Sequence, residues 1–185
     1  MLDFEALWAE ALPFGEFTSR SAEYCRIWEG LYAIARVPAW ALEAVPPGVA
    51  RRFLVIVEDW CGDGPSSIAP LAKLAAQAPG LELRIVGRDD HPELMDRYLT
   101  NGARSIPIVV ALDGDFRELG HWGPRPTELQ AWVMANKATI PKSELYPQVR
   151  KWYARDQGLS TLREVLETAG LPAAGLPAVR TPIPS

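Results

Sequence analysis

Hydrophobic residues recur at helical spacing in the first quarter of the chain. The pattern predicts a short amphipathic helix over residues 3–12 and a longer helix over 19–36. The apolar face of the longer helix is formed by Tyr24, Ile27, Trp28, Leu31 and Ile34. Prolines and a glycine interrupt the next stretch and leave room for a short helix over 39–45. We therefore predict an N-terminal helical extension over residues 1–50.

The pattern changes at Arg51, where apolar runs of strand length alternate with helical segments. The predicted elements are, in order, a strand over 52–58, a helix over 65–78, a strand over 81–86, a helix over 92–100, a strand over 107–112, a return strand over 116–119 and a helix over 126–137. Asp113-Gly114-Asp115 is a tight-turn signal that joins the last two strands as a hairpin. This order predicts an α/β domain over residues 51–138, with a mixed β-sheet flanked by helices.

The segment after Pro141 predicts two further helices, over 143–156 and 160–168. We expect the C-terminal helices within 139–168 to pack on the domain. The remaining tail, 169–185, is rich in proline and poor in large apolar side chains, which predicts a flexible segment.

Composition excludes several classes of function. The chain has 185 residues, enough for one well-buried domain, and no apolar run of membrane-spanning length. Its formal net charge of −4 argues against a nucleic-acid partner, and we expect no membrane partner. The N-terminus lacks the basic start and apolar run of a secretion signal, which predicts a cytoplasmic protein. Its two cysteines, Cys25 and Cys61, are too few for a disulfide scaffold or a cysteine-rich zinc site, and we expect no bound metal.

Cys61 is the candidate for chemistry, because it stands where a strand gives way to a helix. At a helix N-terminus, unpaired backbone N–H groups and the helix dipole favour the thiolate. The carboxylate of Asp63 opposes this effect, so we expect a modest net lowering of the thiol pKa from about 8.5. Small neighbours, Gly62 and Gly64, predict an accessible sulfur beside Trp60. The alternative is an inert cysteine buried as a small core residue.

Three features together resemble thioredoxin-fold proteins. Trp60-Cys61-Gly62 opens a helix directly after a strand. Ser105-Ile106-Pro107 begins a later strand, and a tight hairpin is followed by Gly123 before the last helix of the domain. The resemblance covers about residues 50 to 137. The Trp-Cys-Gly-Asp motif, together with segment 151–158, is similar to an uncharacterised bacterial subgroup of thioredoxin-like proteins.

The resemblance implies a thioredoxin-like fold and a thioredoxin-like site. It implies that Cys61 is the catalytic residue and that a cis peptide bond before Pro107 lies opposite it. The residues implied to bind substrate are Trp60, Gly62, Asp63, Gly64, Ile106, Pro107, Trp122 and Gly123. No cofactor is implied, although glutathione or another external thiol is compatible with the site.

Two departures from the thioredoxin pattern limit the chemistry. A two-cysteine motif needs a second thiol at position 64, which is Gly64, and the buried acid of thioredoxins corresponds to Val55. We therefore expect no proton acceptor beneath the sulfur and no dithiol–disulfide cycle within the chain. Cys25 is either a distant resolving thiol or, as we favour, a half-buried packing residue. His121 is either a general base for Cys61 or, as we favour, solvent-facing.

Two functions follow from these residues. The first is a single-cysteine thiol redox protein, in which Cys61 forms a mixed disulfide or sulfenic acid that an external thiol resolves. Its partners would be a protein or a low-molecular-weight thiol or disulfide. The alternative is a redox-inactive module that binds extended peptides, with its helical flanks open to a partner or a homodimer contact. A metal cluster shared between two subunits and glutathione is the weakest option, because Asp63 adds negative charge beside the sulfur.

Overall fold

The structure is a computed structural model, and it describes residues 2–21, 23–171 and 182–183. Within these residues the strands form a five-stranded mixed sheet in the order β1-β3-β2-β4-β5. The central strand β2 (Arg51–Ile56) is parallel to β3 (Leu81–Val86) and antiparallel to β4 (Ile108–Leu112). β5 (Glu118–Trp122) forms the hairpin with β4, and β1 (Leu12–Pro13) pairs antiparallel with β3 at the other edge. The predicted α/β class, a thioredoxin-like mixed sheet flanked by helices, is confirmed.

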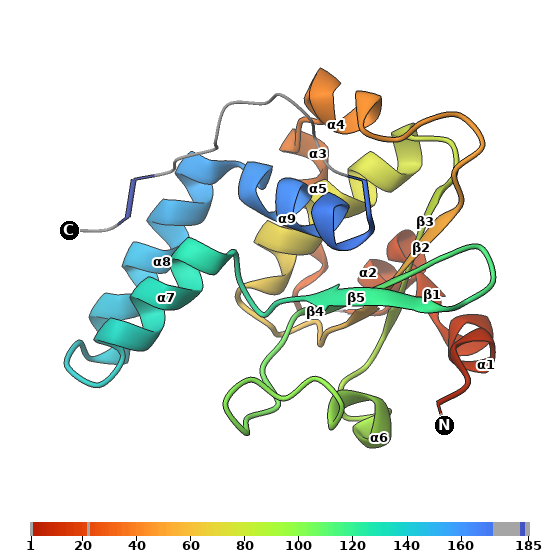
Figure 1. The fold of residues 1–185 in the computed structure, drawn as a ribbon. Helices are drawn as coiled ribbons and strands as arrows, with labels where there is room; N and C mark the ends of the chain where they lie inside the picture. The colour runs from red at the N-terminus through yellow and green to blue at the C-terminus, as the bar shows by residue number, and fades with distance from the viewer. Residues whose placement is uncertain (1, 22, 172–181, 184–185) are drawn as a thin grey trace.

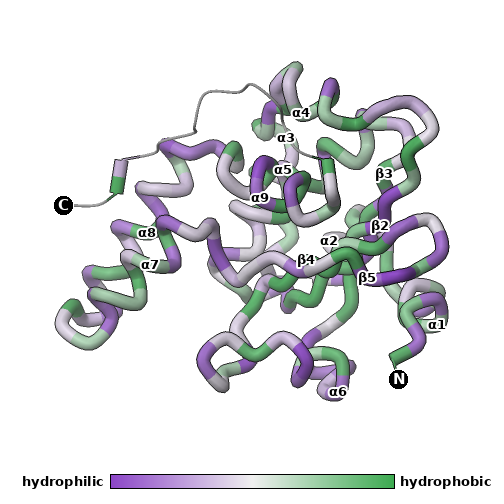
Figure 2. The backbone as a smooth tube through the Cα atoms, viewed as in Figure 1, coloured by the Kyte–Doolittle hydropathy of each residue, from purple (hydrophilic) through white to green (hydrophobic). Residues whose placement is uncertain are grey.

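The core of the molecule lies along the two central strands. Every residue of β4 is buried, and so are residues 53–56 of β2, because helices cover both faces of the sheet. Hydrophobic residues concentrate along these strands (Figure 2). The parallel crossover from β2 to β3 is made by α5 (Gly64–Gln77), which begins with a proline in its first turn.

Helices lie on both sides of the sheet (Figure 1). α3 (Cys25–Ile34), α4 (Ala39–Glu43), α5 and α9 (Leu159–Thr168) lie on one side. α1 (Phe4–Glu10) and α6 (Pro92–Met95) lie on the other. The N-terminal helices and α9 share the main core, since Trp28 and Leu162 are fully buried in it. The helical flanks are therefore packed onto the same core as the sheet.

α7 (Thr127–Asn136) and α8 (Lys142–Asp156) form a helical pair that projects from one end of the sheet (Figure 1). They bury a second apolar cluster, made of Leu129, Val133, Leu145, Val149, Trp152 and Tyr153. α8 also reaches the first turns of α5, where the Ser67 hydroxyl donates to the Tyr153 hydroxyl at 3.3 Å. This contact brings α8 to the helix start that follows Cys61.

Two predicted helices differ from the structure, and one strand was not predicted. The helix expected over 19–36 is two helices, α2 (Phe14–Arg20) and α3, because the Ser21 hydroxyl accepts the Tyr24 N–H at 3.0 Å between them. The helix expected over 92–100 is the single turn α6, after which the chain closes a small turn with Asn101 at φ 51°. The sequence analysis also missed β1, a two-residue edge strand.

The return strand of the hairpin begins later than expected, at Glu118 rather than residue 116. The Asp113 carboxylate accepts the N–H groups of Asp115 and Arg117, and Phe116 adopts a positive φ of 60°. These contacts lengthen the turn and delay the pairing with β4.

The start of the expected flexible tail is packed rather than free. Ala169 and Leu171 are buried, and the Ala169 carbonyl accepts a hydrogen bond from Arg51 Nε at 2.8 Å. The rest of that tail, except residues 182–183, lies outside the described residues. None of the helices in the described part of the chain has the length and apolar character needed to cross a membrane.

Candidate functional site

Cys61 lies in the turn between β2 and α5, as the sequence predicts. Its backbone N–H donates to the Glu58 carbonyl at 3.1 Å, and its own carbonyl accepts the Gly64 N–H at 3.1 Å. The thiol points across the site, where Sγ lies 3.5 Å from the Ile106 carbonyl oxygen and donates to it. The peptide bonds Ile106–Pro107 and Gly123–Pro124 are both cis. The sulfur therefore faces the peptide unit that joins residues 106 and 107.

The thiol of Cys61 is buried, with the residue only 7% exposed. Burial is the largest cause that raises its pKa, from 9.0 to about 11, and the negative charge of Asp63 acts in the same direction. The N–H groups of Asp63 and Gly64 and the charge of Arg125 lower the pKa, but by less. The expected modest lowering is thus wrong, because desolvation of the sulfur outweighs the effect of the helix N-terminus.

A buried ion pair lies directly beside the cysteine. Arg125 Nη2 donates to the Asp63 carboxylate, and Arg125 Nη1 donates to Gln130 Oε1 at 3.0 Å. Burial raises the pKa of Asp63, while the Arg125 guanidinium acts against this rise. The expected opposing effect of the Asp63 carboxylate on the thiolate is therefore present, and that carboxylate is also more buried than the sequence indicates. The position of the thioredoxin acid is Val55, but Asp63 of the motif itself supplies a buried carboxyl group.

Position 64 is closed to any side chain. A Cβ atom on Gly64 would lie 2.9 Å from two ring carbons of Trp28 and 3.1 Å from Val57 Cγ2. Trp28 is fixed there, because its indole Nε1 donates to the Asp59 carbonyl at 2.9 Å. Gly62, in contrast, has open space where its Cβ would stand. Packing, as well as sequence, thus disfavours a second thiol at position 64.

Cys61 borders a hollow of about 410 Å³, which we call the Cys61 groove. One side of it consists of residues 60–63, and Ser105 and Ile106 form the side beyond the sulfur. The groove thus brings together five of the predicted site residues: Trp60, Cys61, Gly62, Asp63 and Ile106. The Trp60 ring is 48% exposed and lies under the guanidinium of Arg88, with 5.0 Å between the guanidinium carbon and the ring centroid.

Four other predicted residues do not line the groove. Gly64 packs on Trp28, and Pro107 is buried behind the groove wall. Trp122 is buried and its indole Nε1 donates to the Glu164 carboxylate of α9 at 2.6 Å. Gly123 has a φ of 130°, and a Cβ there would lie 2.3 Å from the Pro107 carbonyl oxygen. Its role is close packing of backbone rather than contact with a ligand.

The sequence analysis missed the far wall of the groove and its charge. Tyr146, Val149 and Arg150 of α8 line it, at the i, i+3 and i+4 spacing of one helix face. Arginines reach it from four separate segments: Arg88, Arg104, Arg125 and Arg150. No run of basic residues marks them in the sequence. The helical spacing of the α8 residues was the one signal available.

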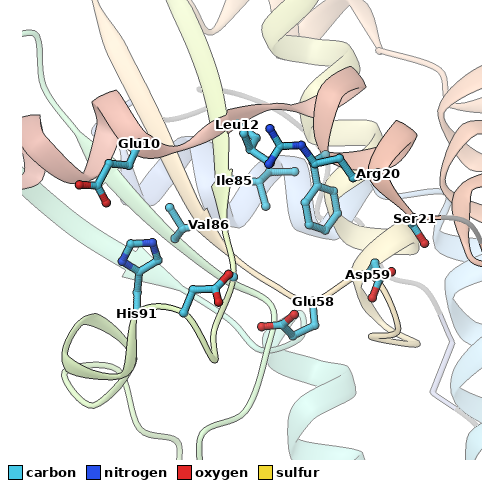
Figure 3. A pocket seen from close by; sticks show the side chains of 12 residues that line it. Glu10, Leu12, Arg20, Ser21, Glu58, Asp59, Ile85, Val86 and His91 are labelled. Atoms are coloured by element: carbon cyan, nitrogen blue, oxygen red, sulfur yellow. The ribbon is translucent and has the colours of Figure 1, made fainter.

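A second hollow, of about 380 Å³, shares the same turn and is lined by Glu58 and Asp59 (Figure 3). We call it the acidic pocket. Glu10 and Asp90 add further carboxylates, and Arg20 and His91 complete its charged lining. Among the described residues, no cluster of histidine, cysteine or carboxylate side chains has the arrangement needed to hold a metal ion.

The remaining candidates lie outside the groove. Cys25 is half-buried at the first turn of α3, and both cysteines are free thiols. His121 is exposed on β5 and packs on Tyr98, with 4.8 Å between the ring centroids. His91 lines the acidic pocket.

A mixed sheet with a cysteine before its crossover helix, facing a cis proline, defines a thioredoxin-like protein. The family comparison agrees: the thioredoxin family model matches residues 21–141, which is most of the chain. The chain therefore belongs to the thioredoxin family.

Two solved structures have the same fold. A protein of unknown function from Pseudomonas aeruginosa is 21% identical, with 92% of this chain and 98% of that chain covered and a TM-score of 0.67. An HIV epitope-scaffold is 20% identical, with 91% and 98% covered and a TM-score of 0.68. No curated protein matches the sequence significantly. At these identities the likeness establishes the fold alone, so the function must be argued from the site.

Proposed function

We propose that this protein is a thioredoxin-fold binding module, in which the Cys61 groove holds an extended segment of a partner protein and Cys61 stays a protonated, redox-inactive thiol. The observation that carries the proposal is the burial of the Cys61 sulfur, which is occupied in a hydrogen bond to the Ile106 carbonyl. A sulfur in this state is a packing and hydrogen-bonding group of the groove wall rather than a nucleophile.

The protonation state of Cys61 supports this proposal. A thiol with a pKa of about 11 leaves only about one molecule in ten thousand as thiolate at neutral pH. The thiolate also has no proton to donate to the Ile106 carbonyl, so ionisation loses that hydrogen bond. Since the thiolate is the reactive form, exchange chemistry at Cys61 is slow.

The closed position at Gly64 removes the usual second step as well. In a dithiol cycle a second cysteine attacks the mixed disulfide and releases the substrate. Here the space for its side chain is filled by Trp28 and Val57. The groove beside Cys61 is present although the second cysteine is not. Its two exposed aromatic side chains, Trp60 and Tyr146, are suited to contact with an extended peptide.

A single-cysteine exchange protein is the second candidate, favoured by the backbone N–H groups of Asp63 and Gly64, which lower the pKa of Cys61. In that reaction the Cys61 thiolate attacks one sulfur of a disulfide, forms a mixed disulfide and expels the other sulfur as a thiolate. An external thiolate such as glutathione then attacks the partner's sulfur in that mixed disulfide. The new external disulfide leaves, and the Cys61 thiolate is restored.

The two functions are separated by the ionisation of Cys61. In a Cys25→Ser variant, Cys61 is the sole thiol, and its alkylation by iodoacetamide across pH is followed by mass spectrometry. We expect the rate to rise toward about pH 11 and to lie about 300-fold below that of a free thiol at pH 7. An apparent pKa at or below that of a free thiol overturns the proposal and favours exchange chemistry. Unfolded protein is excluded as the reacting species by repeating the measurement over a range of urea concentrations.

A further inference from the structure

We infer that the Cys61 groove selects acidic peptide segments, and that Arg150 of α8 is the residue that provides the selectivity. The inference rests on the proposed binding function and names its ligand class. It starts from charge: four arginines line the groove against one carboxylate, Asp63, although the whole chain has a net charge of −4. The groove is therefore locally positive in a protein whose net charge is negative.

The four arginines differ in how far their charge is already neutralised. Arg125 is half-buried and held by Asp63 and Gln130, so it serves the fold. Arg104 makes a two-point pair with Asp96 at 2.7 and 2.8 Å, and exposed pairs of this kind leave other guanidinium N–H groups free.

Arg88 is paired in the same way with its neighbour Asp89, at 2.8 and 3.1 Å. Arg150 is exposed, and within the described residues no carboxylate pairs with it. It is the groove arginine with its full charge available to a ligand.

The lining of the groove favours an extended chain over a single small anion. Its arginines come from four separate segments of the chain, so several guanidinium groups, rather than one, line the hollow. Trp60 and Tyr146 are 48% and 40% exposed, and both line it as flat apolar surfaces. In an extended peptide alternate side chains point the same way, so spaced carboxylates can meet spaced arginines while the backbone lies over the rings.

A long polyanion such as a nucleic acid fits less well. The acidic pocket lies against the same turn and presents Glu58, Asp59 and two further carboxylates. An extended phosphate backbone that leaves the groove on this side meets repulsion, whereas a short acidic segment does not. The α8 wall lies beyond residue 141, where the match to the family ends, so this selectivity is a feature added to the thioredoxin fold.

The test is fluorescence anisotropy with two fluorescein-labelled peptides of about ten residues, one alternating Glu with Ala and the other alternating Gln with Ala. The full chain is titrated into each peptide. We expect the Glu peptide to bind at least about tenfold more tightly than the Gln peptide, and this difference to shrink as salt rises from about 50 to 200 mM. A labelled single-stranded DNA of similar length is the third probe, and we expect it to bind more weakly than the Glu peptide.

The variant Arg150→Gln should weaken binding of the Glu peptide by about fivefold and leave the Gln peptide unaffected. Arg155→Gln is the matched control, because Arg155 is exposed on α8 but does not line the groove. Equal binding of the two peptides overturns the acidic selectivity but agrees with the proposed peptide-binding function. If neither peptide binds, both the selectivity and the proposed binding function are overturned. A selectivity that Arg150→Gln leaves undiminished, or DNA that binds more tightly than the Glu peptide, overturns the inference alone.

Discussion

Two hollows of similar volume, about 380 and 410 Å³, share the turn that carries Cys61 and contain opposite charges. Glu58 and Asp59 turn toward the acidic pocket, in which Glu10 and His91 lie at the far end (Figure 3). Residues 60–63 turn toward the groove, which contains four arginines. Six consecutive residues thus divide the surface around the motif into two electrostatic regions.

The two regions differ more in burial than in the number of charges. In the acidic pocket, Glu10 and Asp90 are exposed, so water screens them. In the groove, Asp63 and Arg125 keep only 11% and 15% of their side chains exposed, and they lie beside a buried thiol. Removing the partner of a desolvated charge costs far more free energy than removing the partner of an exposed, screened charge. We therefore expect substitutions in the groove to change stability strongly and those in the acidic pocket to change it little.

The largest effect is expected from breaking the buried pair. Arg125→Met leaves the Asp63 carboxylate buried without its counter-ion, and should lower the free energy of unfolding by about 3–5 kcal/mol. Adding Asp63→Asn to that variant removes the orphaned charge and should recover much of the loss. Asp59→Asn in the acidic pocket is the matched comparison, with an expected change within about 0.5 kcal/mol. Urea unfolding followed by circular dichroism measures all four proteins, and similar values for Arg125→Met and Asp59→Asn would remove the distinction between the two regions.

The second effect is a loss of stability in alkali caused by Cys61. The pKa of Cys61 is raised in the folded state, so its contribution to stability is fully present below about pH 9 and is lost as the pH rises to about 11. The full loss, which is reached above pH 11, amounts to about 3 kcal/mol. Cys61→Ser keeps a donor for the Ile106 carbonyl but does not ionise in this range. The wild-type protein should therefore lose about 2 kcal/mol more than Cys61→Ser between pH 9 and pH 11, and parallel curves would show that the sulfur is not desolvated.

Sequence patterns were sufficient for the central part of the fold. The strand expected over 81–86 matches β3 residue for residue, because apolar residues alternate there with charged ones between a Pro-Gly end signal and a charged loop, a pattern that favours a strand. β1 gave no signal, since two residues that include Pro13 form a strand only by pairing with β3. The break at Ser21 depends on one side-chain hydrogen bond within an otherwise helical pattern.

For the site, the sequence located the cysteine but not its environment. The turn, the helix start and the proximity of Ile106 follow from the motif and the family resemblance. Burial of the sulfur does not, because it depends on packing by segments distant in sequence. The arginines of the groove are dispersed from Arg88 to Arg150, so only the folded chain brings them together. The sequence therefore favoured an activated thiol, and the desolvation found in the structure reverses that expectation.

The last and smallest effect concerns the start of α5, next to the turn that the two regions share, where Gly64 packs on Trp28. Alanine normally stabilises a helix relative to glycine by up to about 1 kcal/mol. At position 64 the added Cβ would meet the Trp28 ring at 2.9 Å, and that ring is tied to Asp59 beside the acidic pocket, so it cannot shift freely. We expect overpacking to prevail, with Gly64→Ala destabilising the protein by about 1–3 kcal/mol.

Gly62→Ala is the matched control, because its Cβ would stand in open space on the groove side of the same turn, and it should change stability by less than about 0.5 kcal/mol. Thermal unfolding by calorimetry compares the two variants. A Gly64→Ala protein as stable as the Gly62→Ala protein would mean that the Trp28 ring shifts to accommodate the added Cβ with little loss of stability. Position 64 would then be open to a second thiol, and the steric argument against a dithiol cycle would be lost even though the wild-type chain lacks that thiol.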